Sequence, residues 1–518
     1  MKRTLVMLGT CLWLATAATL PAQEPPKPPD KDAAKDAAKD SKDTPKPEQS
    51  VTEHSIAIGG KPVAYTATAG TLVLRNEKDE PTAQFGYTAY VKKGTTDPRT
   101  RPITFSYNGG PGSSSIWLHM GVMGPRRIVT TDADSTPPPP YQVVDNAQSI
   151  LDITDIVMVD PVGTGYSHAI GKSENKNFWG TDPDIESVSQ FIFQYVSDNE
   201  RWNSPKFLLG ESYGTTRSAG VVDYLSNEKG MAMNGVILVS VALDLEAIFE
   251  WPGNERPFPM FIPTFAATAW YHKALSPQPA ALEPFLTEVR QWALGPYAAA
   301  LAKGDTLEAG ERETIVKDLH RYTGLSEEYI RQGNLRITES QFTHELLHGK
   351  RETVGRLDSR FTGFTFDQLG EEAEYDPQSE AISSAFTAAF LDYYHRELKF
   401  GKDKTYHVSG NVFRDWDFKH RVPRSQFPLP MANTGPDLAH AMGLNPRLEI
   451  LVLNGYYDLA TPFFATESMF SHLGLSKEQR ARVTMKYYEA GHMMYVHQPS
   501  LEQMKNDVSA FITAHSGK

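Results

Sequence analysis

The stretch KFLLGESYGTTRSAG, residues 206–220, places a serine between two glycines, where an apolar run gives way to helix-forming residues. Its centre, GESYG (210–214), fits the pattern Gly-x-Ser-x-Gly. Between a strand and a helix, this pattern forms a strained turn that lifts the serine hydroxyl above the edge of a sheet. The pattern is short enough to arise by chance. Its interpretation as a nucleophile therefore depends on partner residues elsewhere in the chain.

Predicted strands and helices alternate on both sides of this turn. β-Branched, aromatic and short apolar runs predict strands at 85–93, 101–110, 154–160, 206–209, 234–240, 447–458 and 482–489. Apolar residues at helical spacing predict helices from Asp182, over 215–227, over 463–473 and at the C-terminal end. This alternation predicts an α/β fold, with a mostly parallel central sheet and helices on both faces.

The composition divides the chain into five segments. We expect a signal peptide (1–22), a tether (23–50), the first part of an α/β domain (51–244), a large, mainly helical cap insertion (245–440) and the second part of the α/β domain (441–518). The cap is rich in aromatic residues and helical patterns, whereas the strand pattern returns only after it.

The N-terminal segment has the layout of a secretory signal peptide, with Lys2 and Arg3 before an apolar run and small residues. A short anchor is the alternative, although the run falls short of the ~20 residues of a membrane span. The Pro-rich segment after it buries almost nothing apolar, which predicts a disordered tether. Cys11, the only cysteine, lies in the predicted signal. We therefore expect an exported protein, periplasmic or secreted, with no stable membrane span, disulfide or catalytic cysteine after processing.

The overall composition excludes one class of partner. The net charge is −12, and no stripe of Lys and Arg is present that could neutralise phosphates. We therefore expect no nucleic-acid partner. Hydrophobic residues at 40% are enough for a substantial core, and the oligomeric state stays open.

A serine hydroxyl becomes a good nucleophile when a histidine takes its proton and an acid orients that histidine. Asp458 directly follows one late predicted strand and His492 follows the next, in the order serine, acid, histidine. Both positions are carboxyl ends of strands, where open α/β sheets collect their sites. His497 is the alternative base, but it falls near the start of the last helix. The sequence predicts the catalytic triad Ser212, Asp458 and His492.

An acyl intermediate also needs hydrogen-bond donors for its oxyanion. The segment SYNGGPGSSS (106–115) follows a predicted strand, and its glycines let backbone N–H groups approach a ligand closely. We expect the N–H groups of Gly110 and Tyr213 to form the oxyanion hole. A tight turn without a ligand is the alternative.

Five motifs together resemble the serine carboxypeptidase family: NGGPGSSS (108–115), DPVGTGYS (160–167), GESYG, the Asp458 loop and AGHM (490–493). The resemblance implies an α/β-hydrolase fold, no metal or organic cofactor, and removal of C-terminal residues from peptide substrates, favoured by acidic pH. It also implies that Asn108, Gly109 and Glu211 bind the terminal carboxylate of the substrate.

The chain departs from the family pattern at three positions near this site. Ser106 stands where the family has Trp, Ser113 where it has Cys, and Val122 where it has a supporting Glu. These departures leave the triad intact, but they affect recognition of the substrate's terminal carboxylate. An exported esterase or acyltransferase with the same triad is therefore the alternative function. A third class, a non-catalytic binding protein, is disfavoured by the complete triad.

HELLH (344–348) matches the zinc motif His-Glu-x-x-His. A zinc protease also needs a third ligand and a water-filled cleft. The motif lies in the predicted cap with no adjoining motif, so we expect an exposed helical face and no metal.

Overall fold

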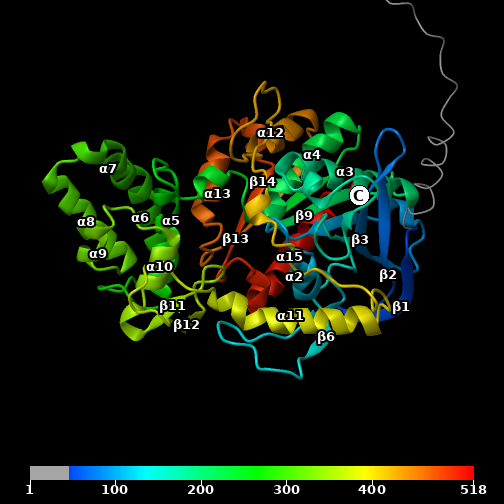
Figure 1. Ribbon diagram of the computed structural model, residues 1–518, viewed down its shortest axis with the longest axis horizontal. Coiled ribbons are helices and arrows are strands. Elements are labelled where there is room, and N and C mark those ends of the chain that lie inside the picture. The colour runs from blue at the N-terminus through cyan, green and yellow to red at the C-terminus, as the bar shows by residue number, and fades with distance from the viewer. Residues whose placement is uncertain (1–45, 518) are drawn as a thin grey trace, which may run out of the picture. The chain divides into compact units, whose positions relative to one another are not determined.

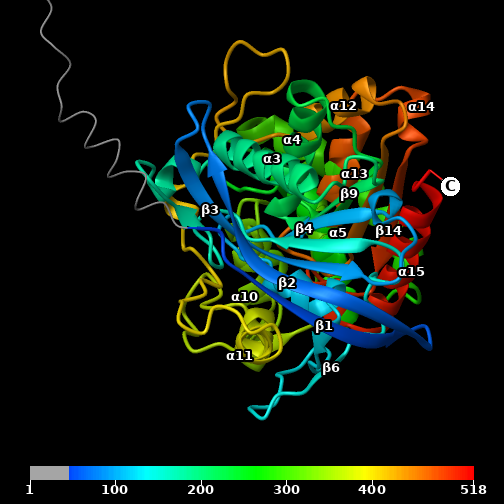
Figure 2. The same cartoon turned by 90° about the vertical axis from the view of Figure 1, so that its right-hand side faces the viewer.

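A ten-stranded sheet runs through residues 46–517, which are the residues that the computed structural model describes (Figures 1 and 2). Its order is β1-β2-β3-β7-β4-β9-β10-β13-β14, with β8 paired to β3. The strands are β1 (Gln49–Ile58), β2 (Lys61–Arg75), β3 (Pro81–Lys92), β4 (Ile103–Tyr107), β7 (Asp155–Val159), β8 (His168–Ala169), β9 (Lys206–Ser212), β10 (Gly235–Val241), β13 (Glu449–Gly455) and β14 (Val483–Tyr488). The predicted signal peptide and most of the predicted tether lie outside the described residues.

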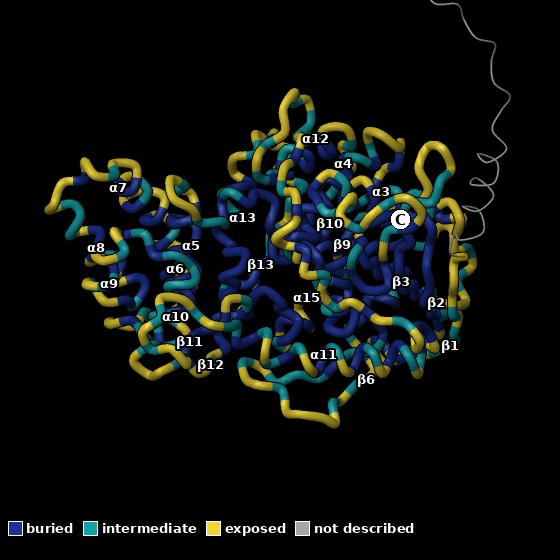
Figure 3. Tube along the Cα trace, in the orientation of Figure 1, coloured by how far each residue is buried: buried dark blue, intermediate teal, exposed yellow. Residues whose placement is uncertain are grey.

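The six strands from β7 to β14 in this order are parallel, and β1, β2 and β3 add an antiparallel ribbon at one edge. The central strands β9, β10 and β13 are buried almost throughout, as Figure 3 shows in dark blue. Continuous apolar runs form such strands because helices cover both of their faces. The predicted α/β fold with a mostly parallel sheet is therefore confirmed.

Helices pack on both faces of this sheet (Figure 2). One face carries α3 (Thr181–Asp198), α4 (Tyr213–Glu228), α12 (Gly435–Leu444) and part of α13 (Phe463–His472). The other carries α2 (Ile116–Leu118), α11 (Pro377–Arg396) and α15 (Gln498–Ala514). Among the described residues, no helix combines the length and apolar character needed to cross a membrane.

The hairpin of β1 and β2 was not among the predicted strands. Its first residue, Gln49, pairs with Gly70, so the ordered sheet starts inside the segment predicted as tether (23–50). Alternate residues of β1 are exposed, and the middle of β2, residues 66–70, consists of threonine, alanine and glycine rather than large apolar residues. The pattern of this edge ribbon is therefore weaker than that of the buried strands.

The segment predicted as one cap, 245–440, lies in two places. A helical subdomain contains α5 (Pro257–Tyr271), α6 (Leu282–Trp292), α7 (Ala298–Lys303), α8 (Ala309–Thr323), α9 (Glu327–Gln332) and α10 (Glu339–Glu345), with a short hairpin of β11 (Glu352–Val354) and β12 (Thr362–Phe364). These elements build their own core and reach the sheet domain at α13 (Figure 1). By contrast, α11 packs into the core beneath the sheet and α12 packs on α4, because their apolar faces complete the α/β domain.

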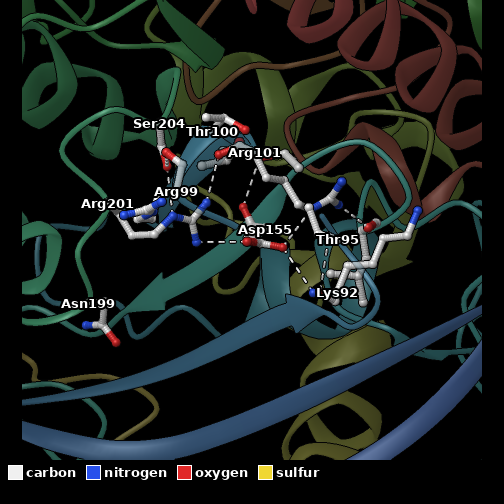
Figure 4. Close-up of polar contacts among 12 residues, drawn as sticks. Lys92, Thr95, Arg99, Thr100, Arg101, Asp155, Asn199, Arg201 and Ser204 are labelled. Atoms are coloured by element: carbon white, nitrogen blue, oxygen red, sulfur yellow. Dashed lines mark hydrogen bonds and ion pairs between the residues drawn. The ribbon is translucent and has the colours of Figure 1, made fainter. Parts of the chain in front are cut away.

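A buried ion cluster lies at the amino ends of the central strands (Figure 4). The Asp155 carboxylate, at the start of β7, accepts hydrogen bonds from Arg101 Nε and Arg201 Nη1, both at 2.8 Å. It also accepts one from the backbone N–H of Lys92, at 3.0 Å. Each carboxylate oxygen of Asp155 therefore has an arginine partner within the protein. This end of the sheet is held by ion pairs, which leaves the opposite, carboxyl end for the candidate active site.

Candidate active site

Ser212 ends β9, and Tyr213 begins α4, so the serine occupies the turn between them. Its backbone has φ of 60° and ψ of −130°, a strained conformation for a residue with a side chain. This is the geometry of a nucleophile elbow, in which the turn projects the hydroxyl from the sheet edge. The predicted nucleophile therefore has the backbone conformation that its role requires.

His492 and Asp458 form a hydrogen-bonded pair. The distance from His492 Nδ1 to Asp458 Oδ2 is 2.8 Å, and Asp458 is fully buried. Asp458 Oδ1 accepts from the backbone N–H groups of Ala460 and Thr461, and the Thr461 hydroxyl donates to Oδ2 at 2.7 Å. The carboxylate is therefore held in one orientation, and it leaves His492 Nε2 as the nitrogen that can accept a proton.

The backbone of His492 is held on both sides. Its N–H donates to the Leu357 carbonyl at 2.6 Å, and its carbonyl accepts from the Ser240 hydroxyl at 2.7 Å. Burial acts to lower the pKa of the imidazole, but the charge and hydrogen bond of Asp458, with the charge of Glu211, outweigh it and raise the pKa. The site thus favours the imidazolium form that appears when a base has taken the proton of serine.

Seven of the predicted site residues line one cavity of about 520 Å³. They are Asn108, Gly109, Gly110, Glu211, Ser212, Tyr213 and His492. Asp458 lies behind His492. Among the described residues, no hydrogen bond joins the Ser212 hydroxyl to His492, a contact that is often loose until substrate binds.

His497, the alternative base, lies elsewhere. Its Nδ1 contacts the Ser500 hydroxyl at 2.7 Å, and its Nε2 lies 3.9 Å from Asp132. It caps the start of α15. The geometry therefore favours His492 as the base.

The predicted oxyanion donors border the same cavity. Tyr213 is the first residue of α4, and N–H groups in the first turn of a helix have no acceptor within the helix. Gly110 lies in the loop after β4, with φ of 104°. Between them, the backbone of Gly109 lies so close to the Tyr213 nitrogen that a Cβ at 109 would collide with it. This contact brings the two loops together at the nucleophile.

Asn108 and Glu211 are joined beside the nucleophile. Asn108 Nδ2 donates to Glu211 Oε1 at 2.7 Å, and its Oδ1 accepts from the N–H of Leu118 at 3.1 Å. The buried Arg217 donates to the Asn108 carbonyl at 2.8 Å and pairs with Asp184 at 2.7 Å. The orientation of the Asn108 amide is therefore determined at three points.

The Glu211 carboxyl is almost completely buried, with 3% of the residue exposed. Burial raises its pKa to about 7, while the positive charge of His492, the nearby Tyr495 hydroxyl and the hydrogen bond from Asn108 oppose the rise. A carboxyl with this pKa carries a proton at acidic pH and loses it near neutrality. It can therefore donate a hydrogen bond to another carboxylate in acid.

Of the three departures from the family pattern, Ser113 lines the cavity, and Ser106 and Val122 are buried outside its lining. Val122 is fully buried and apolar, so it supplies no carboxyl to the Asn108–Glu211 pair. The Ser113 hydroxyl accepts from Trp117 Nε1 at 3.0 Å, and Trp117 lines the cavity. Ser106 is buried in β4.

Several residues at the site carry signals that the sequence patterns do not single out. Arg217 is a charged residue on the buried face of a predicted helix, which is itself a signal of an internal ion pair. Arg356 comes from the turn after β11 and lines the cavity from the side of the helical subdomain. Aromatic residues of the subdomain and the segment after α11 also line it: Phe249, Phe413 and Phe418. Nothing in their local sequence separates them from ordinary core residues.

The HELLH motif has another explanation. His344 is buried, so the expected exposed helical face is wrong. His344 Nε2 lies 3.4 Å from the Asp367 carbonyl and His348 Nε2 lies 3.0 Å from the Gln368 carbonyl. Among residues 46–517, no group of three potential ligands could hold a metal ion. The two histidines contact the 367–368 loop, which accounts for the burial of His344 and for their spacing.

The fold and this arrangement define an α/β-hydrolase with a serine, histidine and aspartate at the carboxyl end of its sheet. The prohormone-processing carboxypeptidase Kex1(delta)p from Saccharomyces cerevisiae has a similar structure. It is 15% identical, with a TM-score of 0.54 over 87% of this chain and 92% of that one. Two further solved structures match with TM-scores of 0.34 and 0.33: a monoglyceride lipase from Saccharomyces cerevisiae (12% identical, 86% and 96% covered) and a carboxyl esterase from Bacillus coagulans (12% identical, 86% and 98% covered).

Residues 63–241 match the model of the serine carboxypeptidase family. This stretch contains the Asn108 loop and the nucleophile turn, and it confirms the resemblance that the motifs indicated. No curated protein matches the chain by sequence.

Proposed function

We propose that this protein is a serine-type carboxypeptidase that releases C-terminal residues from peptides through an acyl-enzyme intermediate. The observation that carries the proposal is the Asn108–Glu211 pair, which borders the cavity one residue from Ser212. A group that binds the C-terminal carboxylate of the substrate must lie next to the nucleophile that attacks the last peptide bond. The match of residues 63–241 to the family model supports hydrolysis by serine, and the position of this pair supports the choice of the C-terminal bond.

The reaction begins when His492 Nε2 takes the proton of the Ser212 hydroxyl. The serine oxygen then bonds to the carbonyl carbon of the last peptide bond, and the carbonyl oxygen becomes an oxyanion. The N–H groups of Gly110 and Tyr213 stabilise that charge. The C–N bond breaks, His492 gives its proton to the leaving amine, and the substrate remains as an ester on Ser212. Water, deprotonated by His492, then hydrolyses the ester and restores the serine.

Asp458 has a supporting role in these steps. Its hydrogen bond to Nδ1 holds the imidazole in the tautomer that leaves Nε2 free. Its charge stabilises the imidazolium that forms during both steps. Every step uses a side chain or backbone group of this chain, so we propose that the reaction needs no cofactor.

Recognition of the chain end should favour substrate binding in acid. The Asn108 amide and the protonated Glu211 carboxyl donate hydrogen bonds to the substrate's terminal carboxylate. When Glu211 ionises, two carboxylates would repel each other in a buried site. Binding of free-acid peptides should therefore weaken as the pH rises through the pKa of Glu211, about 7.

We further propose that the mature enzyme acts outside the cytoplasm, because the N-terminal segment has the layout of an export signal. N-terminal sequencing of the purified mature protein checks this point. An active form that retains residues 1–22 in the cytoplasm would contradict it.

A substrate panel tests the proposed activity. The wild type should release the C-terminal residue of a free-acid peptide at pH 5 faster than it cleaves the C-terminal amide of the same peptide. Ser212→Ala should abolish both reactions and labelling by a fluorophosphonate probe. Equal cleavage of acid and amide would overturn the carboxypeptidase proposal. If simple esters were cleaved best, the esterase or acyltransferase function would replace it, for which the apolar Val122 is the structural reason.

A further inference from the structure

Tyr495 lies three residues after His492, in a short 3₁₀ helix (Met494–Val496) that leads to α15. Its side chain is buried, with 2% of the residue exposed. Its hydroxyl makes no hydrogen bond of normal geometry among the described residues, and the same is true of Glu211 Oε2. Two buried polar atoms without partners are costly, and a donor and an acceptor that face each other can satisfy both.

The surroundings of Tyr495 place this hydroxyl at the Asn108–Glu211 pair. The tyrosine interacts with both Glu211 and Asn108 through its hydroxyl. Its ring lies against Gly121, at a distance where a Cβ on residue 121 would overlap the ring carbons. Only glycine at this position leaves room for the ring. The adjacent residue is Val122, whose buried side chain supplies no polar group.

We propose that Tyr495 is a positioning residue that donates a hydrogen bond from its hydroxyl to the Glu211 carboxyl, in the place that Val122 leaves without a polar group. The role rests on the proposed function, because Glu211 is the group that would read the substrate carboxylate. Asn108 holds Oε1 at 2.7 Å, and Tyr495 holds the other oxygen. Donors on both oxygens fix the plane of the carboxyl in the cavity wall.

The tyrosine also sets the pH at which Glu211 ionises. A donor stabilises the ionised carboxylate, so Tyr495 lowers the pKa of Glu211 against the effect of burial. Burial and the Glu211 charge raise the pKa of Tyr495 itself well above its ordinary value. The hydroxyl therefore remains a donor throughout the working pH range.

Tyr495→Phe tests this role because it removes one oxygen and keeps the ring against Gly121. Tyr488→Phe is the matched control: Tyr488 is also buried near the end of β14, and its hydroxyl donates to Asp507 at 2.9 Å, outside the site. The first readout needs no substrate. It is the infrared band of the protonated Glu211 carboxyl, identified as the band that Glu211→Gln removes, followed as the pH rises.

The expected result is that this band persists to a pH about one unit higher in Tyr495→Phe, since a hydrogen bond to a charged group has roughly that effect. Tyr488→Phe should titrate as the wild type does. The second readout is KM for a free-acid peptide, whose rise with pH should shift upward by the same amount. A purely structural role would raise KM at every pH and leave the midpoint in place.

An unchanged infrared titration in Tyr495→Phe would overturn the proposal. That result is separable from a failure of the proposed function. If the wild type does not distinguish free acids from amides, the carboxypeptidase proposal fails, yet the infrared titration still shows whether Tyr495 bonds Glu211. If the infrared band shifts and the KM midpoint does not, Tyr495 contacts Glu211 without positioning it for substrate, and the positioning role is refuted.

Discussion

Replacing Glu211 with glutamine should change both the stability of the protein and its pH dependence. Burial raises the pKa of this carboxyl from 4.5 to about 7, which corresponds to about 3 kcal/mol. The folded protein holds the proton more tightly than the unfolded chain does. The stability from this group is therefore complete below pH 4.5 and is lost as the pH rises to about 7.

Glutamine keeps the shape of the side chain but does not titrate. Between pH 5 and pH 8 the wild type should lose about 2.5 kcal/mol of unfolding free energy relative to Glu211→Gln, from the same difference in pKa. Urea unfolding of both proteins at the two pH values measures this. Only the change with pH is diagnostic, because the amide also alters hydrogen bonding at both pH values.

The same titration should control substrate binding. At pH 8 about one tenth of Glu211 remains protonated, so KM for a free-acid peptide should rise about tenfold between pH 5 and pH 8. The C-terminal amide of the same peptide lacks the carboxylate, so its KM should change much less. In Glu211→Gln the tenfold rise should disappear, since the amide group donates at either pH.

Glu339→Gln is the matched control for this experiment. Burial also raises the pKa of Glu339 to about 7; its carboxylate pairs with Arg356 of the cavity wall at 3.4 Å, but Glu339 itself does not line the cavity of Ser212. It should change the pH dependence of stability and leave the tenfold rise in KM. The reasoning is refuted if KM of Glu211→Gln still rises tenfold, or if Glu339→Gln removes the rise as well.

Two further predictions concern stability. Asp155→Ala should lower the unfolding free energy by about 3–5 kcal/mol, because it leaves the buried Arg201 and the largely buried Arg101 without their carboxylate; Asp97→Ala removes a half-exposed carboxylate and should cost much less in the same urea unfolding, and equal losses would contradict the assignment. His420 lies between Asp182 and Asp437, at 2.6 and 2.9 Å; burial acts to lower its pKa, but the two carboxylates raise it to about 9. The contribution of His420 to the free energy of unfolding is thus complete below pH 6.5. It is lost as the pH rises through 9, and the total loss is about 3 kcal/mol. His420→Gln should remove that loss from unfolding curves at pH 6 and pH 9.5, and an unchanged pH dependence would refute it.

The sequence predicted the central sheet well because its strands are buried on both faces. Continuous apolar runs such as 154–160 stand out from their flanks, and the structure has β7 at Asp155–Val159. The edge strand β1 was missed because alternate residues along it are exposed. The two locations of the cap helices could not be predicted either. A helical apolar face specifies that a helix is covered, and it does not specify which core covers it.

Part of the candidate site could be predicted from the sequence in the same way. Ser212 ends its strand, and Asp458 and His492 follow the ends of theirs within a few residues, so topology brings the three to one edge. Tyr495 and Arg217 act from positions that resemble core residues in sequence. An aromatic residue after a histidine, or an arginine inside a helix, has no local pattern that gives its partner. Their partners become visible only when distant segments are packed together.

The buried polar groups around Asn108 indicate how the site retains an unfavourable carboxyl. Holding Glu211 in the wall of the cavity costs stability near neutral pH, yet that same burial brings its pKa into the range where it can both hold and lose a proton. The protein tolerates this loss of stability because other contacts hold the groups around Glu211 in place. Arg217 is paired with Asp184 and donates a hydrogen bond to the Asn108 carbonyl. Removing Arg217 would free the backbone on which the pair depends. The ion pair behind the site therefore stabilises the fold where the carboxyl destabilises it.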